Sequence, residues 1–169
     1  MKINFLNYAF LGGASLAMLI FALVSEYVYA YQPCSLCIQQ RYPHVLIVVL
    51  CLIIFTLKKK ISIIYVLNIL LIGISIILAF YHVGVENNIF LGPDSCSPYE
   101  LSKNLDKSPE VILNEILAKP MISCNTVSWS FLSLSMASWN LIFSLLLFFS
   151  WIFSFIKVTK NYSSSSTSQ

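Results

Sequence analysis

Charged residues are scarce in this sequence. Only 10% of its 169 residues are Asp, Glu, Lys or Arg, whereas a soluble globular domain has roughly 25%. No internal repeat is evident, so the chain is not a repeat array. Hydrophobic residues make up 58% of the chain, and the mean hydropathy is +0.81. The composition therefore excludes an ordinary soluble domain and indicates a membrane protein.

The hydrophobic residues are gathered in four long runs, Phe5–Val24, Pro43–Leu57, Ile61–Tyr81 and Trp139–Ile156. A helix that crosses the ~30 Å hydrocarbon core needs about 20 residues. We therefore expect an all-α membrane protein, a single domain over residues 1-156 built as a bundle of four transmembrane helices at about 5-25, 38-57, 61-81 and 136-156. The second run is long enough only if its helix begins near Ser35 or Ile38. Pro43 then predicts a kink, or a helix that begins at Pro43 after an ordered loop.

Basic residues without acidic neighbours mark alternate ends of these spans, at Lys2, Lys58, Lys59, Lys60, Lys157 and Lys160. Such ends face the cytoplasm, so both termini are predicted inside, and the loops at about 26-37 and 82-135 outside. The Ser-rich end, 157-169, lacks apolar periodicity and is predicted to be a disordered cytoplasmic tail. A signal peptide cleaved near Ala30 is the alternative, but the apolar segment is long for one and cleavage would leave only three spans.

The second outer loop contains one predicted helix. Ser108-Pro109-Glu110 is typical of a helix start, and Pro120 of a stop. Between them four residues share an apolar face, Ile112, Leu113, Ile116 and Leu117. We expect this short amphipathic helix to lie on the membrane surface between Cys96 and Cys124 and to hold that pair of cysteines near the first pair.

Four of the five cysteines, Cys34, Cys37, Cys96 and Cys124, fall on the outer side, whereas Cys51 lies in the second span and is predicted to be a small core residue. Cys34 and Cys37 form a Cys-x-x-Cys motif at the membrane edge, a pattern suited to thiol–disulfide exchange. Arg41 is expected to stabilise the Cys37 thiolate, and an arginine in a span is costly enough to indicate a function. Four thiols allow three pairings, and the sequence alone does not choose among them.

Two structural interpretations compete with redox chemistry. In one, the outer cysteines form inert disulfides that staple the loops, although a Cys-x-x-Cys ring restrains little chain entropy. In the other, they bind zinc, but Cys96 and Cys124 lack the short spacing of a zinc ribbon, so no metal site is predicted. His82, in an i,i+4 relation to Glu86, and His44 are candidate proton carriers; the alternative is that both are interfacial polar residues.

Together these motifs resemble those of the bacterial disulfide bond formation protein B (DsbB) family, which are quinone-dependent thiol oxidases of the inner membrane. The resemblance covers nearly the full chain. Besides the cysteines of the second loop, it rests on Pro33-Cys34-Ser35-Leu36-Cys37, Gln40-Arg41-Tyr42-Pro43-His44, Tyr81-His82-Val83-Gly84-Val85-Glu86, Gly92-Pro93, Trp129-Ser130-Phe131-Leu132 and Met136. The vitamin K epoxide reductase family is less similar, because its loop thiols precede the Cys-x-x-Cys motif instead of following it.

The resemblance implies a protein-disulfide oxidoreductase of the bacterial inner membrane. Its Cys34–Cys37 pair would be oxidised by ubiquinone or another membrane quinone, and its Cys96–Cys124 pair would oxidise a periplasmic DsbA-like protein of the thioredoxin fold. By the same resemblance, the partner attacks Cys96, Cys124 links to Cys34 during the relay, and Cys37 delivers electrons to the quinone beside Arg41. His82 resembles a family histidine near the quinone. No nucleic acid is expected as a partner, and the alternative is a structural membrane protein with inert loop disulfides.

Overall fold

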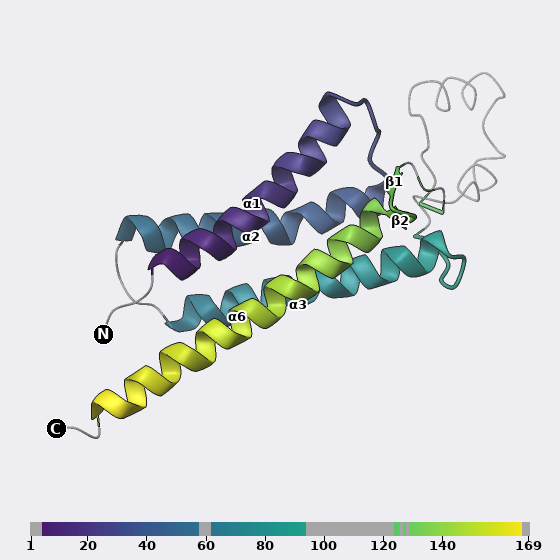
Figure 1. The fold of residues 1–169 in the computed structure, drawn as a ribbon. Coiled ribbons are helices and arrows are strands. Elements are labelled where there is room, and N and C mark those ends of the chain that lie inside the picture. Colours follow the sequence, from purple (N-terminus) through teal and green to yellow (C-terminus); the bar gives the residue numbers. More distant parts are fainter. Residues whose placement is uncertain (1–4, 58–61, 94–123, 126, 128, 167–169) are drawn as a thin grey trace, which may run out of the picture.

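A computed structural model of the chain describes residues 5–57, 62–93, 124–125, 127 and 129–166. Its elements are four long helices, α1 (Phe5–Tyr27), α2 (Ser35–Leu57), α3 (Ser62–Glu86) and α6 (Met136–Ser166), and two short strands, β1 (Ser130–Phe131) and β2 (Leu134–Ser135) (Figure 1). The amphipathic helix predicted between Ser108 and Pro120, and Cys96, lie outside the described residues.

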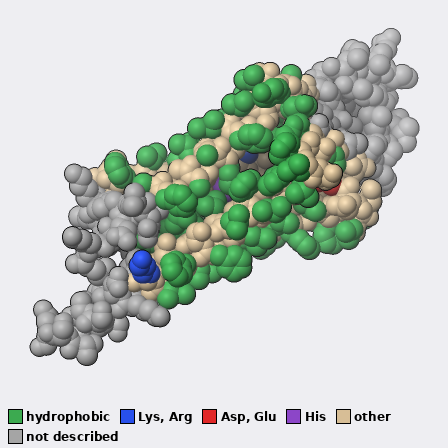
Figure 2. All heavy atoms as spheres, in the orientation of Figure 1, with side chains coloured by type: hydrophobic (Ala, Val, Ile, Leu, Met, Phe, Trp, Pro, Cys, Tyr) green, Lys and Arg blue, Asp and Glu red, His purple; other side chains and the backbone are tan. Residues whose placement is uncertain are grey.

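The four helices pack as a bundle, which confirms the predicted all-α membrane fold. Each of the four is long and apolar enough to cross a membrane. In sequence order, α1 packs on α2, α2 on α3 and α3 on α6, while α1 and α6 make far fewer contacts with each other. Apolar side chains cover much of the outer face in Figure 2, as expected for a surface that lipid surrounds. The bundle is therefore least closed between its first and last helices.

The second helix begins at Ser35 and continues through Pro43 to Leu57, so the alternative start at Pro43 is wrong. A proline inside a helix removes one backbone donor. Here the cost is offset by burial along one stripe of the helix, at Leu36, Gln40, Pro43, His44, Ile47, Cys51 and Ile54. The Cys-x-x-Cys motif consequently belongs to the first turn of a membrane helix.

Two helices extend beyond the runs from which they were predicted. The third reaches Glu86, which places His82 and Glu86 on consecutive turns at its end. We call this the outer end, because the loop that follows it is predicted to lie outside the cytoplasm. The last helix continues to Ser166, so residues 157–166 are helical where the sequence predicted a disordered tail. No proline or glycine interrupts this segment, and Ser costs a helix only a few tenths of a kcal/mol per residue relative to Ala, so the helix continues past its apolar part.

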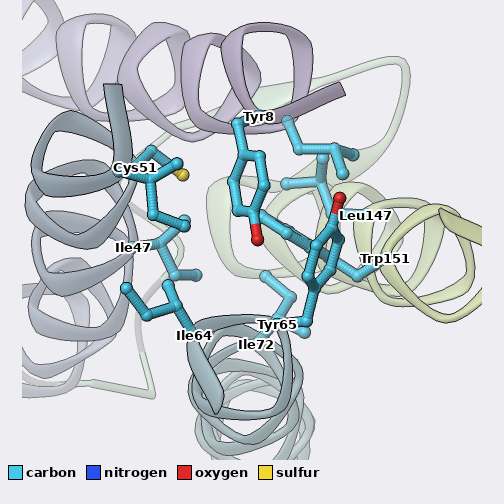
Figure 3. Packing of buried hydrophobic residues seen from close by; sticks show 10 residues of the cluster. Tyr8, Ile47, Cys51, Ile64, Tyr65, Ile72, Leu147 and Trp151 are labelled. Carbon is cyan, nitrogen blue, oxygen red and sulfur yellow. The ribbon is translucent and has the colours of Figure 1, made fainter. Parts of the chain in front are cut away.

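The core beside the first turns of α1 and α3 contains a cluster of three aromatic side chains. Tyr8, Tyr65 and Trp151 come from α1, α3 and α6, and their ring centroids lie 4.6 to 5.6 Å apart (Figure 3). Cys51 of α2 packs in the same cluster, which confirms that it is a core residue. Because one residue from each helix meets here, the cluster holds all four helices in register and so positions their outer ends.

A small hairpin at the outer end leads into the last helix. Its strands pair Ser130 with Ser135 and Phe131 with Leu134. The two turn residues, Leu132 and Ser133, have φ angles of 52° and 64°, as a two-residue turn of type I′ requires. The sequence did not predict this hairpin because neither turn residue is Gly, Asn or Asp. It places Trp129 and Met136 beside the cysteine motif, where both line a small hollow.

Candidate active site at the outer end of the bundle

The two thiols of the Cys-x-x-Cys motif are held together by the start of α2. Cys34 occupies the position before the helix, and its sulfur accepts a hydrogen bond from the backbone N–H of Cys37 at 3.4 Å, as an N-cap side chain does. The two sulfur atoms lie 3.3 Å apart and both are free thiols. This short N-terminal turn therefore presents a reduced pair that is close enough to form a disulfide with little movement.

His82 of α3 brings an imidazole to the first thiol. Its Nε2 lies 3.4 Å from Cys34 Sγ, and its Nδ1 lies 2.7 Å from Nε2 of Gln40. Glu86, one turn further along α3, places a carboxylate oxygen 3.8 Å from His82 Nε2 and accepts a hydrogen bond from Ser135 at 2.5 Å. His82 is 2% exposed, so it is a buried component of the cysteine cluster.

These contacts act on the ionisation of Cys34. The hydrogen bond with Cys37 is the largest cause, and together with the contact to His82 it lowers the pKa of the Cys34 thiol, although burial opposes the shift. A thiolate is the nucleophile in disulfide exchange. Sequence reasoning favoured the Cys37 thiolate beside Arg41, whereas the geometry places the stabilising contacts on Cys34.

Arg41 forms an ion pair with Glu26 from the end of α1. Both side chains are mostly buried, with 18% and 23% of their surface exposed. Arg41 lies less than two turns after the cysteine motif and lines a cavity that Cys37 also lines. An arginine in a membrane helix needs a partner or a route to the interface, and Glu26 supplies the partner that the sequence analysis did not assign.

The second-loop cysteine Cys124 reaches this cluster. It is disulfide-bonded, 1% exposed, and packs with Cys34, Leu36 and Val85. Its sulfur lies 3.7 Å from the hydroxyl oxygen of Ser35. The structure thus brings Cys34, Cys37, His82 and Cys124 together, whereas Cys96, the other cysteine of the expected second pair, lies outside the described residues.

A cavity of about 650 Å³ opens between α1 and α6, where these helices are least in contact. It extends from Cys37 and Arg41 at the outer end to Phe10 and Ser150 deeper in the bundle, and apolar side chains dominate its walls. In Figure 2 apolar side chains surround a hollow on this face, with basic and histidine atoms visible inside. From Phe10 to Ala22 the cavity follows α1 for about 18 Å, at 1.5 Å per residue.

The few polar groups in the cavity gather near its outer end, at Gln40, Arg41, His44 and Asn140. His44 is 3% exposed, and its Nδ1 is buried without a hydrogen-bond partner among the described residues. An apolar channel with a polar end fits an amphiphilic ligand that has a polar ring and a long apolar chain. An isoprenoid quinone has these properties.

Sequence reasoning assigned no role to three residues of this site: Glu26, Gln40 and Asn140. Glu26 follows the first apolar run, and an arginine within a span needs a partner such as a nearby carboxylate. Gln40 and Asn140 are polar residues within apolar spans, and that contrast was a usable signal. Their meeting across α2 and α6 depends on helix packing, which no local pattern encodes.

Among the described residues, three potential metal-ligand atoms within 4.8 Å of one another belong to Cys34, Cys37 and His82. Three ligands are one short of the four in a structural zinc site. The disulfide-bonded state of Cys124 also removes the thiolate that a four-thiolate site would need. The cluster therefore suits a redox pair with an imidazole better than it suits a structural metal.

Comparison with known proteins agrees with this geometry. The family model described as "Disulfide bond formation protein DsbB" matches residues 6–154. A protein named disulfide bond formation protein B, from Acinetobacter baumannii, is 32% identical over 154 residues, which cover 84% of this chain and 87% of that protein. An uncharacterized protein of Rickettsia prowazekii is 28% identical over 134 residues, covering 79% and 77% of the two chains. No solved structure matches the chain significantly.

Proposed function

Since the chain belongs to the DsbB family, we propose that it oxidises the dithiol of a periplasmic DsbA-like protein and passes the electrons through two cysteine pairs to a membrane quinone. In bacteria such a relay keeps the periplasm oxidising. The observation that carries the proposal is the position of Cys37. It lines the long apolar cavity, while the adjacent thiol, Cys34, contacts His82 and packs with Cys124.

This arrangement assigns different tasks to the two thiols. Cys34 lies on the side of the loop cysteine and exchanges disulfides with Cys124, whose sulfur is next to the first turn of α2. Cys37 lies on the side of the cavity and faces the electron acceptor. In the second loop, Cys96 is the sulfur that the partner protein attacks, and the Cys124 thiolate that this attack releases carries the exchange to Cys34.

The reoxidation of Cys34 and Cys37 takes place on the side of the cavity. The sulfur of the Cys34 thiolate bonds to that of Cys37, and the Cys37 S–H bond breaks. The thiolate and the thiol together give up two electrons and one proton, and the proton that Cys34 lost on ionising is the second. A bound quinone would supply the chemistry of accepting two electrons and two protons. Arg41 provides a fixed positive charge where negative charge develops on the acceptor.

Two histidines are available at this end for protons and hydrogen bonds. His82 Nε2 lies 3.4 Å from the sulfur of Cys34, and its buried ring adjoins Glu86. His44 has a buried Nδ1 without a hydrogen-bond partner among the described residues at the polar end of the cavity, so it is suited to contact an oxygen-bearing ring there. Inert loop disulfides would require neither a low thiol pKa at Cys34 nor an apolar cavity against Cys37.

The direct test uses the purified protein in lipid nanodiscs with a short-chain ubiquinone and a reduced thioredoxin-fold partner. Quinone absorbance should fall in step with oxidation of the partner, and Cys37→Ser should abolish quinone reduction. Extraction and mass measurement should show bound quinone in the protein as purified. Absence of quinone reduction by the parent protein, with both substrates in excess, would leave the structural alternative as the better account.

A further inference from the structure

A continuous chain of side-chain hydrogen bonds connects the cavity to Cys34. His44 Nε2 lies 3.3 Å from Asn140 Oδ1, Asn140 Nδ2 donates to Gln40 Oε1 at 2.5 Å, and Gln40 Nε2 lies 2.7 Å from His82 Nδ1. The final contact joins His82 Nε2 to Cys34 Sγ at 3.4 Å. The chain runs from α2 at His44 to α6, back to α2 at Gln40 and on to α3 at His82. These three residues are at most 5% exposed.

The chain has one direction. An amide N–H can only donate, so the Asn140 amino group facing Gln40 fixes the Gln40 carbonyl toward α6 and its amino group toward His82. His82 Nδ1 must then be the acceptor, and in a neutral ring the proton resides on Nε2. That nitrogen is the one beside Cys34. Each link from Asn140 onward therefore donates toward the sulfur, whereas His44 Nε2 also lies 3.1 Å from the hydroxyl oxygen of Ser75.

We propose that Asn140 is a positioning residue that acts through Gln40 to keep the proton of His82 on the nitrogen facing Cys34, so that Cys34 is the thiol held as the thiolate. The proposal rests on the proposed function, in which Cys34 is the exchanging sulfur. Amide groups do not pass protons along, so the chain orients the imidazole and is not a proton wire.

Other groups also face Cys34 and must be kept constant. They are Cys37 and Arg41 from α2, and Glu86 from α3, which line the same hollow, with Tyr31 from the preceding loop. None of these groups hydrogen-bonds Asn140 or Gln40 among the described residues. Asn140→Leu therefore changes the hydrogen-bond chain without altering a charge near the sulfur, whereas Asn140→Asp also adds a carboxylate, so that the tautomer of His82 is the decisive readout for Asn140→Asp.

The informative substitution is Asn140→Asp. A carboxylate at this position only accepts, so the Gln40 amide rotates, its carbonyl faces His82, and the imidazole proton moves to Nδ1. Cys34 then faces a lone pair. Asn140→Leu removes the constraint without imposing the opposite one and should give a smaller effect. Ser144→Ala is the matched control, because Ser144 hydrogen-bonds Asn140 Oδ1 at 3.4 Å on the side away from Gln40.

Two readouts test the proposal without quinone or partner protein, so their failure and that of the proposed function can be told apart. The protein has two histidines, so ¹⁵N-histidine labelling gives NMR signals from two imidazole rings. These signals are assigned by comparison with His44→Gln. The parent should show His82 protonated on Nε2, and Asn140→Asp should show it on Nδ1. In a Cys37→Ser background, the pH midpoint for alkylation of Cys34 should rise by one unit or more in Asn140→Asp, and less in Asn140→Leu. Ser144→Ala should change neither quantity.

A parent His82 protonated on Nδ1 would overturn the proposal. So would an unchanged tautomer and midpoint in either Asn140 variant that retains parental helicity by circular dichroism. If Asn140→Asp does not fold, Asn140→Leu decides the question alone.

Discussion

Arg41 and Glu26 form an ion pair that ties the outer end of α1 to the second turn of α2. The pair borders the cavity at the position where Cys37 also lines it. A positive charge is thus held in place by the carboxylate beside it. This arrangement gives Arg41 a structural role toward Glu26, in addition to the chemical role that we propose for it toward the cavity.

The first prediction separates those roles. Arg41→Gln should slow quinone reduction by about 10²-fold or more, the size of effect seen when one charge-stabilising donor is removed. Arg41→Lys should restore part of the rate, because a point charge lacks the planar fork of guanidinium. Thiol exchange with the partner should continue in both variants. Glu26→Gln breaks the same ion pair but keeps the cation, so it should retain more activity than Arg41→Gln. Equal rates in the parent and Arg41→Gln would remove Arg41 from the mechanism.

The second prediction concerns pH. The contacts with Cys37 and His82 lower the pKa of the Cys34 thiol, so the pH midpoint for alkylation of Cys34 should lie below that of an ordinary thiol. His82→Phe should move the midpoint upward, but not to the ordinary value, because the contact with Cys37 remains the larger cause. Mass-mapped labelling over a pH series measures this, with buried Cys51 as the unlabelled reference. A midpoint near 9 in the parent would contradict it.

The third prediction tests the order of the relay. Cys124→Ser should leave Cys96 able to hold the partner protein as a stable mixed disulfide, because the thiol that resolves it has been removed. Non-reducing electrophoresis after incubation with an oxidisable partner should show the cross-linked species. Adding Cys96→Ser should abolish it. If the first variant traps nothing, the partner does not enter through Cys96.

The fourth prediction compares adjacent glycines of α1. A Cβ at Gly12 would lie 2.8 Å from the Cβ of Cys51, whereas a Cβ at Gly13 would meet nothing within 4 Å. Gly12→Ala should therefore destabilise the packing of α1 on α2 by about 1–3 kcal/mol, as overpacking does. Gly13→Ala should be neutral or stabilising, since alanine is the better helix former. Thermal unfolding in detergent measures the stability of both variants. Equal unfolding temperatures for the two would refute the close approach of Gly12 to Cys51.

The fifth prediction concerns orientation. Lysines at alternate span ends predict that both termini and Lys59 lie in the cytoplasm. The structure is consistent with an even number of crossings, because α1 begins and α6 ends at the same end of the bundle (Figure 1). A reporter that is active only in the cytoplasm should work when fused after Lys59, and one inserted after Tyr29 should not. The opposite result would show that the protein has the reverse orientation in the membrane.

The sequence alone was sufficient to predict four membrane helices, the membrane class and the closeness of the two Cys-x-x-Cys thiols. These properties are local, since an apolar run of sufficient length must be helical in lipid, and two thiols three residues apart share a helix turn wherever that turn lies. It was less informative at the ends of helices. The extension to Ser166 and the hairpin at Leu132 and Ser133 depend on weak propensities and on neighbouring packing, not on a distinct residue pattern.

Only the tertiary structure decided which groups meet at the redox pair. Glu26 reaches Arg41, and Asn140 reaches Gln40 over a separation of 100 residues. His82 contacts Cys34, although local reasoning had placed the important charge at Cys37. Such contacts depend on the rotation and depth of each helix in the bundle, which are set by many weak packing interactions across all four helices. A residue pattern along one helix contains no information about the face that its neighbour presents.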